Sequence, residues 1–284
     1  FKMKIADFLK ADTLRTDLFI RIYERGQDVE LFDLSGKTAI ITGSSRGIGE
    51  AIAVRMAEHG ANVVISSRKA DACDAVTEAI NNKYPGRAKT IAAHIGDKDA
   101  LQNLVDETEK AFGQVDILVC NAAVNPYFGP SAECPDDAFD RVMECNVKSN
   151  HWLMNMVIPG MKERKDGAII VISSIAGQMG QPALGVYGLS KAADSALARN
   201  MAVEHGMDNI RTNAIAPGLI KTYFAKALWD NPEILEVATS TTPMKRIGSP
   251  DEIAGAAVFL ASPAGSYVNG QTLTIDGGQV INGF

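Results

Sequence analysis

Cysteine, histidine and clustered positive charge are scarce in this 284-residue sequence, and each scarcity argues against a class of protein. The four cysteines and four histidines show no metal-like spacing, so no metal site is expected. Few cysteines, and an N-terminal stretch without a continuous apolar core, predict a cytoplasmic protein. The net charge of −6 argues against a nucleic-acid partner. No apolar run reaches the roughly 18 residues that a membrane span needs.

Short runs rich in valine and isoleucine alternate with helical stretches from residue 37 onward. The expected strands are 38–42, 62–66, 90–94, 117–120, 168–173, 211–216 and 272–275; the expected helices are 47–59, 71–83, 98–113, 136–162, 187–206 and 250–261. Strands that are apolar throughout predict burial on both faces. This alternation predicts an α/β fold, with one doubly wound (Rossmann) domain over residues 36–284 and a seven-stranded parallel sheet.

Residues 1–35 stand outside this alternation and form a predicted N-terminal helical extension. Leu14, Leu18 and Ile22 recur at four-residue steps, which is typical of an amphipathic helix. We expect this helix to pack on the domain or on a neighbouring subunit. Binding to a membrane surface is the alternative, but the polar face is mixed rather than basic.

A glycine-rich turn lies between the first apolar strand and the first helix of the domain, within the segment TGSSRGIG at residues 42–49. Glycine allows a tight turn and a close approach of the backbone to a pyrophosphate, and the helix start offers free N–H groups. A strand–turn–helix context of this kind predicts a dinucleotide site. The residues expected to contact the dinucleotide here are Gly43, Ser45, Arg46, Gly47, Ile48 and Gly49.

The end of the second strand indicates which dinucleotide would bind. Cofactors without a 2′-phosphate are usually held there by an acidic residue, but this sequence has no carboxylate before Asp71. Ser67 and Arg68 can instead donate to a phosphate, and Arg46 in the glycine turn can close on the same group. The sequence therefore favours NADP(H) over NAD(H).

Tyr187 and Lys191 are one helical turn apart at the start of a predicted helix, so their side chains share a face. A nearby ammonium and an oxidised nicotinamide would both favour the phenolate and lower the pKa of the phenol. Ser174 lies thirteen residues before the tyrosine, at the carboxyl end of a buried strand, where open α/β sheets bind their ligands.

The motifs TGxxxGIG, NAA, NV, SSxxG, YxxxK and PG occur in that order, and the chain resembles the short-chain dehydrogenase/reductase family over about residues 36–284. The resemblance implies that Tyr187 is the general acid in reduction and the general base in oxidation. Lys191 would lower the pKa of Tyr187 and bind the nicotinamide ribose. Ser174, with Ser173 as the alternative, would orient the substrate oxygen. Asn146 would hold a water that links Lys191 to solvent.

The same resemblance assigns further cofactor contacts. Asn121 and Ala122 would close over the adenosine half. His94 stands where the family commonly has an aspartate near the adenine, so the backbone of Ile95 is expected to satisfy the adenine edge. The segment after the sixth strand, which begins with the expected cofactor residues Pro217 and Gly218, would contact the nicotinamide carboxamide through Ile220 and Thr222.

The substrate is expected between residues 125–130 and a lid at 219–243, a neighbourhood rich in apolar and aromatic side chains. A hydrophobic ketone, aldehyde or secondary alcohol fits this neighbourhood. The runs NAAVNP (121–126) and APGLIKT (216–222) are similar to those of the NADPH-dependent carbonyl and retinal reductases of animals, a resemblance that implies the same class of reaction. The alternatives are an NAD-dependent alcohol dehydrogenase, an enoyl-thioester reductase with a longer Tyr–Lys spacing, and a catalytically silent cofactor-binding scaffold. Family habit implies a homotetramer or homodimer.

Overall fold

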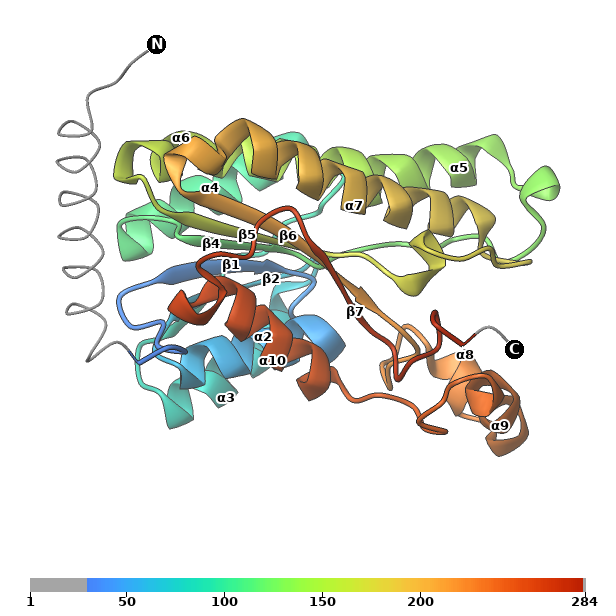
Figure 1. The fold of residues 1–284 in the computed structure, drawn as a ribbon. Coiled ribbons are helices and arrows are strands. Elements are labelled where there is room, and N and C mark those ends of the chain that lie inside the picture. Colours follow the sequence, from blue (N-terminus) through green and yellow to red (C-terminus); the bar gives the residue numbers. More distant parts are fainter. Residues whose placement is uncertain (1–29, 283–284) are drawn as a thin grey trace, which may run out of the picture.

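A computed structural model describes residues 30–282 of the chain (Figure 1). The described residues form a seven-stranded parallel sheet with the strand order β3-β2-β1-β4-β5-β6-β7. The strands are β1 (Thr38–Thr42), β2 (Asn62–Ser66), β3 (Ala88–Thr90), β4 (Ile117–Cys120), β5 (Gly167–Ile172), β6 (Ile210–Pro217) and β7 (Thr272–Ile275). The order runs outward in both directions from β1 and β4, so the carboxyl ends of these two strands flank the topological switch point where such sheets bind ligands.

Helices cover both faces of the sheet, which confirms the predicted doubly wound fold (Figure 1). One face is packed by α2 (Gly47–Glu58), α3 (Ala70–Lys83) and α10 (Pro250–Ala261). The other is packed by α4 (Lys98–Phe112), α6 (Ser149–Arg164) and α7 (Gly185–His205), with α5 (Asp136–Met143) beside α7.

Each strand supplies both layers of the core because successive side chains point to opposite faces. In β1, Ile41 packs with α2, α3 and α10, whereas Ile40 packs with α4, α6 and α7. Both side chains are fully buried. Burial on both faces explains why the strands are apolar throughout instead of alternating.

Four of the seven expected strands have the predicted bounds, and the third differs most. The expected strand 90–94 is observed as Ala88–Thr90, although Ile91 and Ala93 still donate backbone hydrogen bonds to the carbonyls of Ile65 and Ser67. The chain there runs beside β2 at the edge of the sheet, where it has a strand on one side only.

The expected helix 136–162 is divided, and the lid contains helices that were not expected. The π-helical turn η3 (Glu144–Lys148) separates α5 from α6. The lid carries α8 (Lys226–Trp229) and α9 (Pro232–Ser240). The amphipathic helix expected around residues 14–22 lies outside the described residues, so the division into an extension (1–35) and a domain (36–284) stays a prediction. Within residues 30–282, every helix is too short or too polar to span a membrane.

Candidate active site

The glycine-rich turn lies between β1 and α2 and is closely packed against the end of β4. Gly43 and Gly47 have positive φ angles of 66° and 65°, which L-residues with side chains rarely adopt. A Cβ on Gly49 would lie 2.6 Å from the carbonyl oxygen of Gly43 and 2.5 Å from Nδ2 of Asn121. The turn therefore requires glycine both for its backbone angles and for the approach of α2 to the strand ends.

Asn121, which follows β4, holds the glycine turn in place. Its Nδ2 donates to the carbonyl oxygens of Thr42 (2.8 Å) and Gly43 (3.2 Å). The backbone N–H groups of Asn121 and Ala122 both donate to the Thr42 hydroxyl. The asparagine thus fixes the shape of the turn, a task distinct from the contact with adenosine implied by the family resemblance.

A cavity of about 370 Å³ opens over the carboxyl ends of β1, β2 and β4. Seven of the residues expected to bind the cofactor line it: Gly43, Ser45, Arg46, Ser67, Arg68, Ile95 and Ala122. Arg46 is the N-cap of α2, and it makes no side-chain hydrogen bond to the first turn of that helix. The first-turn N–H groups of α2 are therefore available to a phosphate, and the glycines leave the space that a pyrophosphate would occupy. These observations fit a dinucleotide cofactor.

The charge around this cavity is positive. Arg46, Arg68, Lys69 and Arg141 are among its lining residues, and the described residues that line it include no aspartate or glutamate. The guanidinium of Arg46 lies 4.4 Å from the ring centre of Tyr223, a lid residue, and both side chains are exposed. A lining of this charge favours an anionic ligand group.

His94, at the position that the sequence analysis singled out, also lines the cavity. Its Nδ1 accepts from the backbone N–H of Gly96 (3.0 Å), and its Nε2 lies 3.1 Å from the Arg141 guanidinium. The side chain of Arg141 comes from α5, so residues far apart in sequence form this wall of the cavity. Arg141 was not predicted from the sequence, because an isolated arginine on a helix belongs to no motif.

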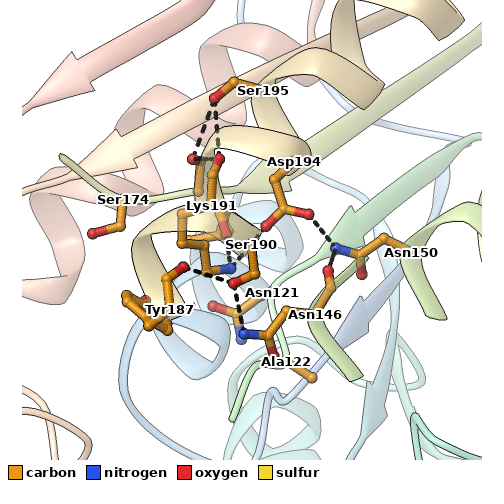
Figure 2. Close-up of polar contacts among 12 residues, drawn as sticks. Asn121, Ala122, Asn146, Asn150, Ser174, Tyr187, Ser190, Lys191, Asp194 and Ser195 are labelled. Atoms are coloured by element: carbon orange, nitrogen blue, oxygen red, sulfur yellow. Dashed lines mark hydrogen bonds and ion pairs between the residues drawn. The ribbon is translucent and has the colours of Figure 1, made fainter. Parts of the chain in front are cut away.

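Tyr187 and Lys191 lie on one face of α7, and Ser174 lies beside them after β5 (Figure 2). The Lys191 ammonium is 5.7 Å from the centre of the Tyr187 ring. The Ser174 hydroxyl accepts from the backbone N–H of Ala176 at 3.1 Å, which fixes its side chain at the start of a short 3₁₀ turn. Ser173, the alternative, is buried and donates to the carbonyl of Lys191, so it faces the helix and not open space.

Burial and charge act in opposite directions on the phenol. Burial raises the pKa of Tyr187 above its ordinary value, the Asp194 carboxylate raises it further, and the Lys191 ammonium and the Ser174 hydroxyl lower it. Burial works to lower the pKa of Lys191, but the charges of Asp194 and Tyr187 outweigh it and raise that pKa. The lysine is therefore charged at neutral pH, and it is the main group that favours the phenolate.

Asn146 is buried in the π-helical turn η3 (Figure 2). Its side chain exchanges two hydrogen bonds with the backbone of Val124 and donates to the Ser190 hydroxyl at 3.1 Å. Its own carbonyl oxygen accepts from Nδ2 of Asn150 at 2.6 Å. The expected water-mediated link from Asn146 to Lys191 stays a prediction; a chain of side chains through Asn150 and Asp194 also joins them.

Asn150 and Asp194 were not predicted from the sequence. Asn150 lies four residues after Asn146, and Asp194 lies three residues after Lys191, spacings that place each pair on one helix face. That spacing was the available signal. The sequence could not show that α6 and α7 bring the two pairs together.

The remaining expected cofactor residues lie at the carboxyl end of β6 and in the glycine turn. Pro217 ends β6, and Gly218 follows it with its backbone N–H donating to Ile275. The Ile220 side chain packs in the core, so only its backbone is available to a ligand. A Cβ on Gly47 would lie 3.4 Å from Thr222, and Ile48 is partly buried against the core.

Among residues 30–282, no cluster of three or more His, Cys, Asp or Glu side chains could hold a metal ion.

Comparison with known proteins agrees with this geometry. A family model described as enoyl-(acyl carrier protein) reductase matches residues 43–279. "Dehydrogenase/reductase SDR family member 4" of Bos taurus is 40% identical over 247 residues, which cover 87% of this chain and 88% of that protein. The protein of the same name from Caenorhabditis elegans is 39% identical, with 86% of this chain and 95% of that protein covered.

Solved structures show the same relationship. A 7α-hydroxysteroid dehydrogenase, complexed with NADH and 7-oxo glycochenodeoxycholic acid, superposes with a TM-score of 0.83 at 42% identity, covering 87% of this chain and 95% of that one. A gluconate 5-dehydrogenase from Burkholderia cenocepacia, in complex with NADP and tartrate, gives a TM-score of 0.84 at 32% identity, covering 89% and 98%. With its parallel sheet, glycine turn and Ser–Tyr–Lys arrangement, the chain belongs to the short-chain dehydrogenase/reductase family of oxidoreductases.

Proposed function

We propose that this oxidoreductase is an NADPH-dependent carbonyl reductase, which also oxidises the corresponding alcohols with NADP⁺. The observation that carries the proposal is the basic lining of the cavity: Arg46 lies in the glycine turn after β1, Arg68 follows β2, and the described lining residues include no acidic residue. A carboxylate at this place would accept from ribose hydroxyls and repel a 2′-phosphate, whereas two guanidinium groups bind one.

The residues near α7 supply the proton chemistry. A bound nicotinamide would supply or accept the hydride at the substrate carbon. In reduction, the Tyr187 hydroxyl donates its proton to the carbonyl oxygen, and Ser174 donates a hydrogen bond to the same oxygen. In oxidation, the Tyr187 phenolate takes the proton from the alcohol. The Lys191 ammonium stabilises that phenolate throughout.

Apolar side chains near Tyr187 support a hydrophobic substrate. The ring centres of Tyr187 and Phe224 are 6.0 Å apart, and Phe224 and Phe128 are both exposed. A large exposed aromatic side chain beside a reactive group, as Phe224 is beside Tyr187, favours a ligand with apolar surface. The 7-oxo bile acid bound by a structural neighbour is a ketone of this class, whereas tartrate in another neighbour is polar. We therefore propose a hydrophobic ketone, aldehyde or secondary alcohol as the substrate.

The cofactor preference is tested with Arg46→Ala and Arg68→Ala, compared with Arg199→Ala on the exposed side of α7. Each charge-assisted hydrogen bond to phosphate contributes about 1.5–3 kcal/mol, so each cavity variant should raise the KM for NADPH by about 10- to 100-fold. The KM for NADH should change little, and Arg199→Ala should behave as the parent. A parent enzyme that turns over with NADH alone would refute the cofactor assignment and favour an NAD-dependent alcohol dehydrogenase.

The reaction is tested with a screen of aldehydes, aromatic ketones, diketones, quinones and keto esters, followed by Tyr187→Phe. Phenylalanine keeps the ring packing but has no proton to give, so turnover should fall by about 10²-fold or more. Activity with none of the carbonyl classes would favour the silent scaffold. Reduction of an enoyl thioester is disfavoured by the four-residue step from Tyr187 to Lys191, and including one such compound tests it.

We also propose that the protein is a cytoplasmic homotetramer or homodimer. Large apolar side chains are exposed near the end of α7 and in the segment before β7: Val203, Met207 and Tyr267. The two segments are in contact, since Nδ2 of Asn269 donates to the Ala202 carbonyl oxygen at 3.1 Å, and neighbouring exposed apolar groups favour a subunit contact. Gel filtration with light scattering should give a mass of two or four chains, and a monomer would refute the assembly.

A further inference from the structure

The Lys191 ammonium is buried and is held by two acceptors, one of which is the Asp194 carboxylate (Figure 2). The residue is 2% exposed, and its Nζ donates to the Ile172 carbonyl oxygen at 2.8 Å and to Oδ2 of Asp194 at 2.9 Å. Asp194, one turn further along α7, is fully buried. Two of the three N–H groups of the ammonium are thereby used, and one is left for a ligand or for Tyr187.

The Asp194 carboxylate is itself held on both oxygens. Its Oδ1 accepts from Nδ2 of Asn150 at 2.9 Å, and the second hydrogen of that amide goes to the carbonyl of Asn146 at 2.6 Å. Asn150 belongs to α6, so the carboxylate is clamped between its own helix and the neighbouring one. A buried carboxylate with fixed partners on both oxygens cannot turn away from the ammonium.

We propose that Asp194 is a positioning residue for the oxidoreductase reaction. Fixed by its hydrogen bond from Asn150, it holds the Lys191 ammonium next to Tyr187 and sets how strongly that ammonium favours the phenolate. The proposal rests on the proposed role of Tyr187 as the acid and base. It adds a negative charge to the site, so the ammonium acts on the phenol as one half of an ion pair rather than as a free cation.

The groups around this pair determine the direction of the effect. Tyr187 faces Lys191 on α7, Ser174 approaches from the end of β5, Cys120 faces the pair from β4, and Asn150 faces it from α6. Burial raises the pKa of the Cys120 thiol well above its usual range, so that thiol stays neutral. Burial raises the pKa of the Asp194 carboxyl above its ordinary value, while the Lys191 ammonium and the Asn150 amide act to lower it. Paired with Lys191 at 2.9 Å, Asp194 is the negative charge that opposes the ammonium.

Without this negative charge, the Tyr187 phenol and the Lys191 ammonium both lose a proton more easily. A carboxylate raises the pKa of a neighbouring phenol and of a neighbouring ammonium alike, so its loss lowers the apparent pKa of the Tyr187–Lys191 pair whichever group titrates. For a unit charge several ångströms away, at the effective dielectric constant of about 20 that suits buried sites, the shift is about one pH unit or more.

The experiment compares Asp194→Asn and Asp194→Ala with the parent. Asparagine keeps the size of the side chain, and alanine suits the interior of α7. Asp116→Asn is the matched control, because Asp116 is also a buried carboxylate but accepts from the backbone N–H of Thr38 at the amino ends of the strands. Unfolding temperatures establish that each variant is folded.

Two readouts are measured. The first is the pH profile of 1-phenylethanol oxidation with NADP⁺. The second is an ultraviolet titration of tyrosinate absorbance. Subtracting the titration of the matching Tyr187→Phe protein isolates the absorbance change of Tyr187. In both, the Asp194 variants should titrate about one pH unit lower than the parent, and Asp116→Asn should not shift. A purely structural role for Asp194 would reduce activity without moving either midpoint.

The possible results separate this proposal from the assigned reaction. If Tyr187→Phe is inactive and the Asp194 variants keep the parent midpoints, the role of Asp194 is refuted and the reaction stands. If Tyr187→Phe is fully active, the proposed reaction fails, whereas the tyrosinate titration still tests the effect of Asp194 on the phenol. If neither Asp194 variant folds, Asn150→Ala replaces them: it should give a smaller shift in the same direction, and an unchanged midpoint refutes the proposal.

Discussion

Gly49→Ala should separate the shape of the glycine turn from its chemistry, because the substitution adds a single methyl group. The new Cβ would lie 2.6 Å from the Gly43 carbonyl oxygen and 2.9 Å from its carbonyl carbon. These are backbone atoms that cannot rotate away, so α2 and the turn must move apart by most of an ångström. Overpacking of this kind costs about 1–3 kcal/mol.

Gly255→Ala on α10 is the matched control for this prediction. Both glycines are helical, but among residues 30–282 no atom beyond the chain neighbours of Gly255 and the adjacent backbone of α10 lies within 4 Å of the position that its Cβ would occupy. Alanine there should stabilise the fold by about 0.5–1 kcal/mol, since it reduces the backbone freedom of the unfolded chain. The two substitutions are chemically identical, and only their surroundings differ.

The assay combines thermal unfolding with NADPH binding measured by fluorescence. At about 2–4 °C for each kcal/mol in a chain of this size, Gly49→Ala should lower the unfolding temperature by several degrees and Gly255→Ala should raise it slightly. Gly49→Ala should also weaken NADPH binding about tenfold or more, because it displaces the first-turn N–H groups of α2 from the cavity. If Gly49→Ala matches the parent in stability and NADPH affinity, the close packing described for the turn is refuted.

Three further predictions concern other parts of the molecule. Lys191→Ala leaves the buried Asp194 carboxylate without its cation and should cost about 3–5 kcal/mol of stability. The double variant Lys191→Ala/Asp194→Ala should recover part of this stability but none of the activity. Equal unfolding temperatures for the single and double variants would contradict this prediction. Arg246 and the Ser249 backbone lower the pKa of Glu252 to about 2. Because the pKa is lower in the folded than in the unfolded chain, the contribution of Glu252 to stability is fully present above pH 4.5. Glu252→Gln should therefore destabilise the protein by about 1 kcal/mol at pH 7, with a difference that shrinks as the pH falls from 4.5 toward 2; a difference independent of pH would count against the contribution of the ion pair. Of the four cysteines, Cys134 alone is partly exposed. An aromatic disulfide reagent should therefore react rapidly with one thiol in the native protein and with all four after unfolding. Rapid reaction of more than one thiol would show that the core opens readily.

Local patterns in the sequence predicted most of the fold. The bounds of β1, β2, β4 and β7 agree with the expected strands, because continuous apolar runs between turn residues are sufficient to define a strand buried on both faces. The expected strand at 90–94 was displaced, since an edge strand with a neighbour on one side is weakly specified by its own residues. The lid helices α8 and α9 were not expected from a segment without a clear apolar period.

The expected active-site residues followed from spacing and strand position. One helical turn between Tyr187 and Lys191 places them on one face wherever the helix lies, and Ser174 at a strand end must face the carboxyl edge of the sheet. The arginines expected at the phosphate position, Arg46 and Arg68, both line the cavity for the same reason, because each follows a neighbouring parallel strand.

The sequence by itself determined most of the strands, the glycine turn and the pairing of Tyr187 with Lys191, because each depends on residues that are close along the chain. Only the tertiary structure decided which residues surround that pair. Asn150 and Asp194 are 44 positions apart, and Arg141 reaches His94 across 47. Contacts of this kind depend on how α5, α6 and α7 pack against the sheet, and no local period in the sequence encodes that packing.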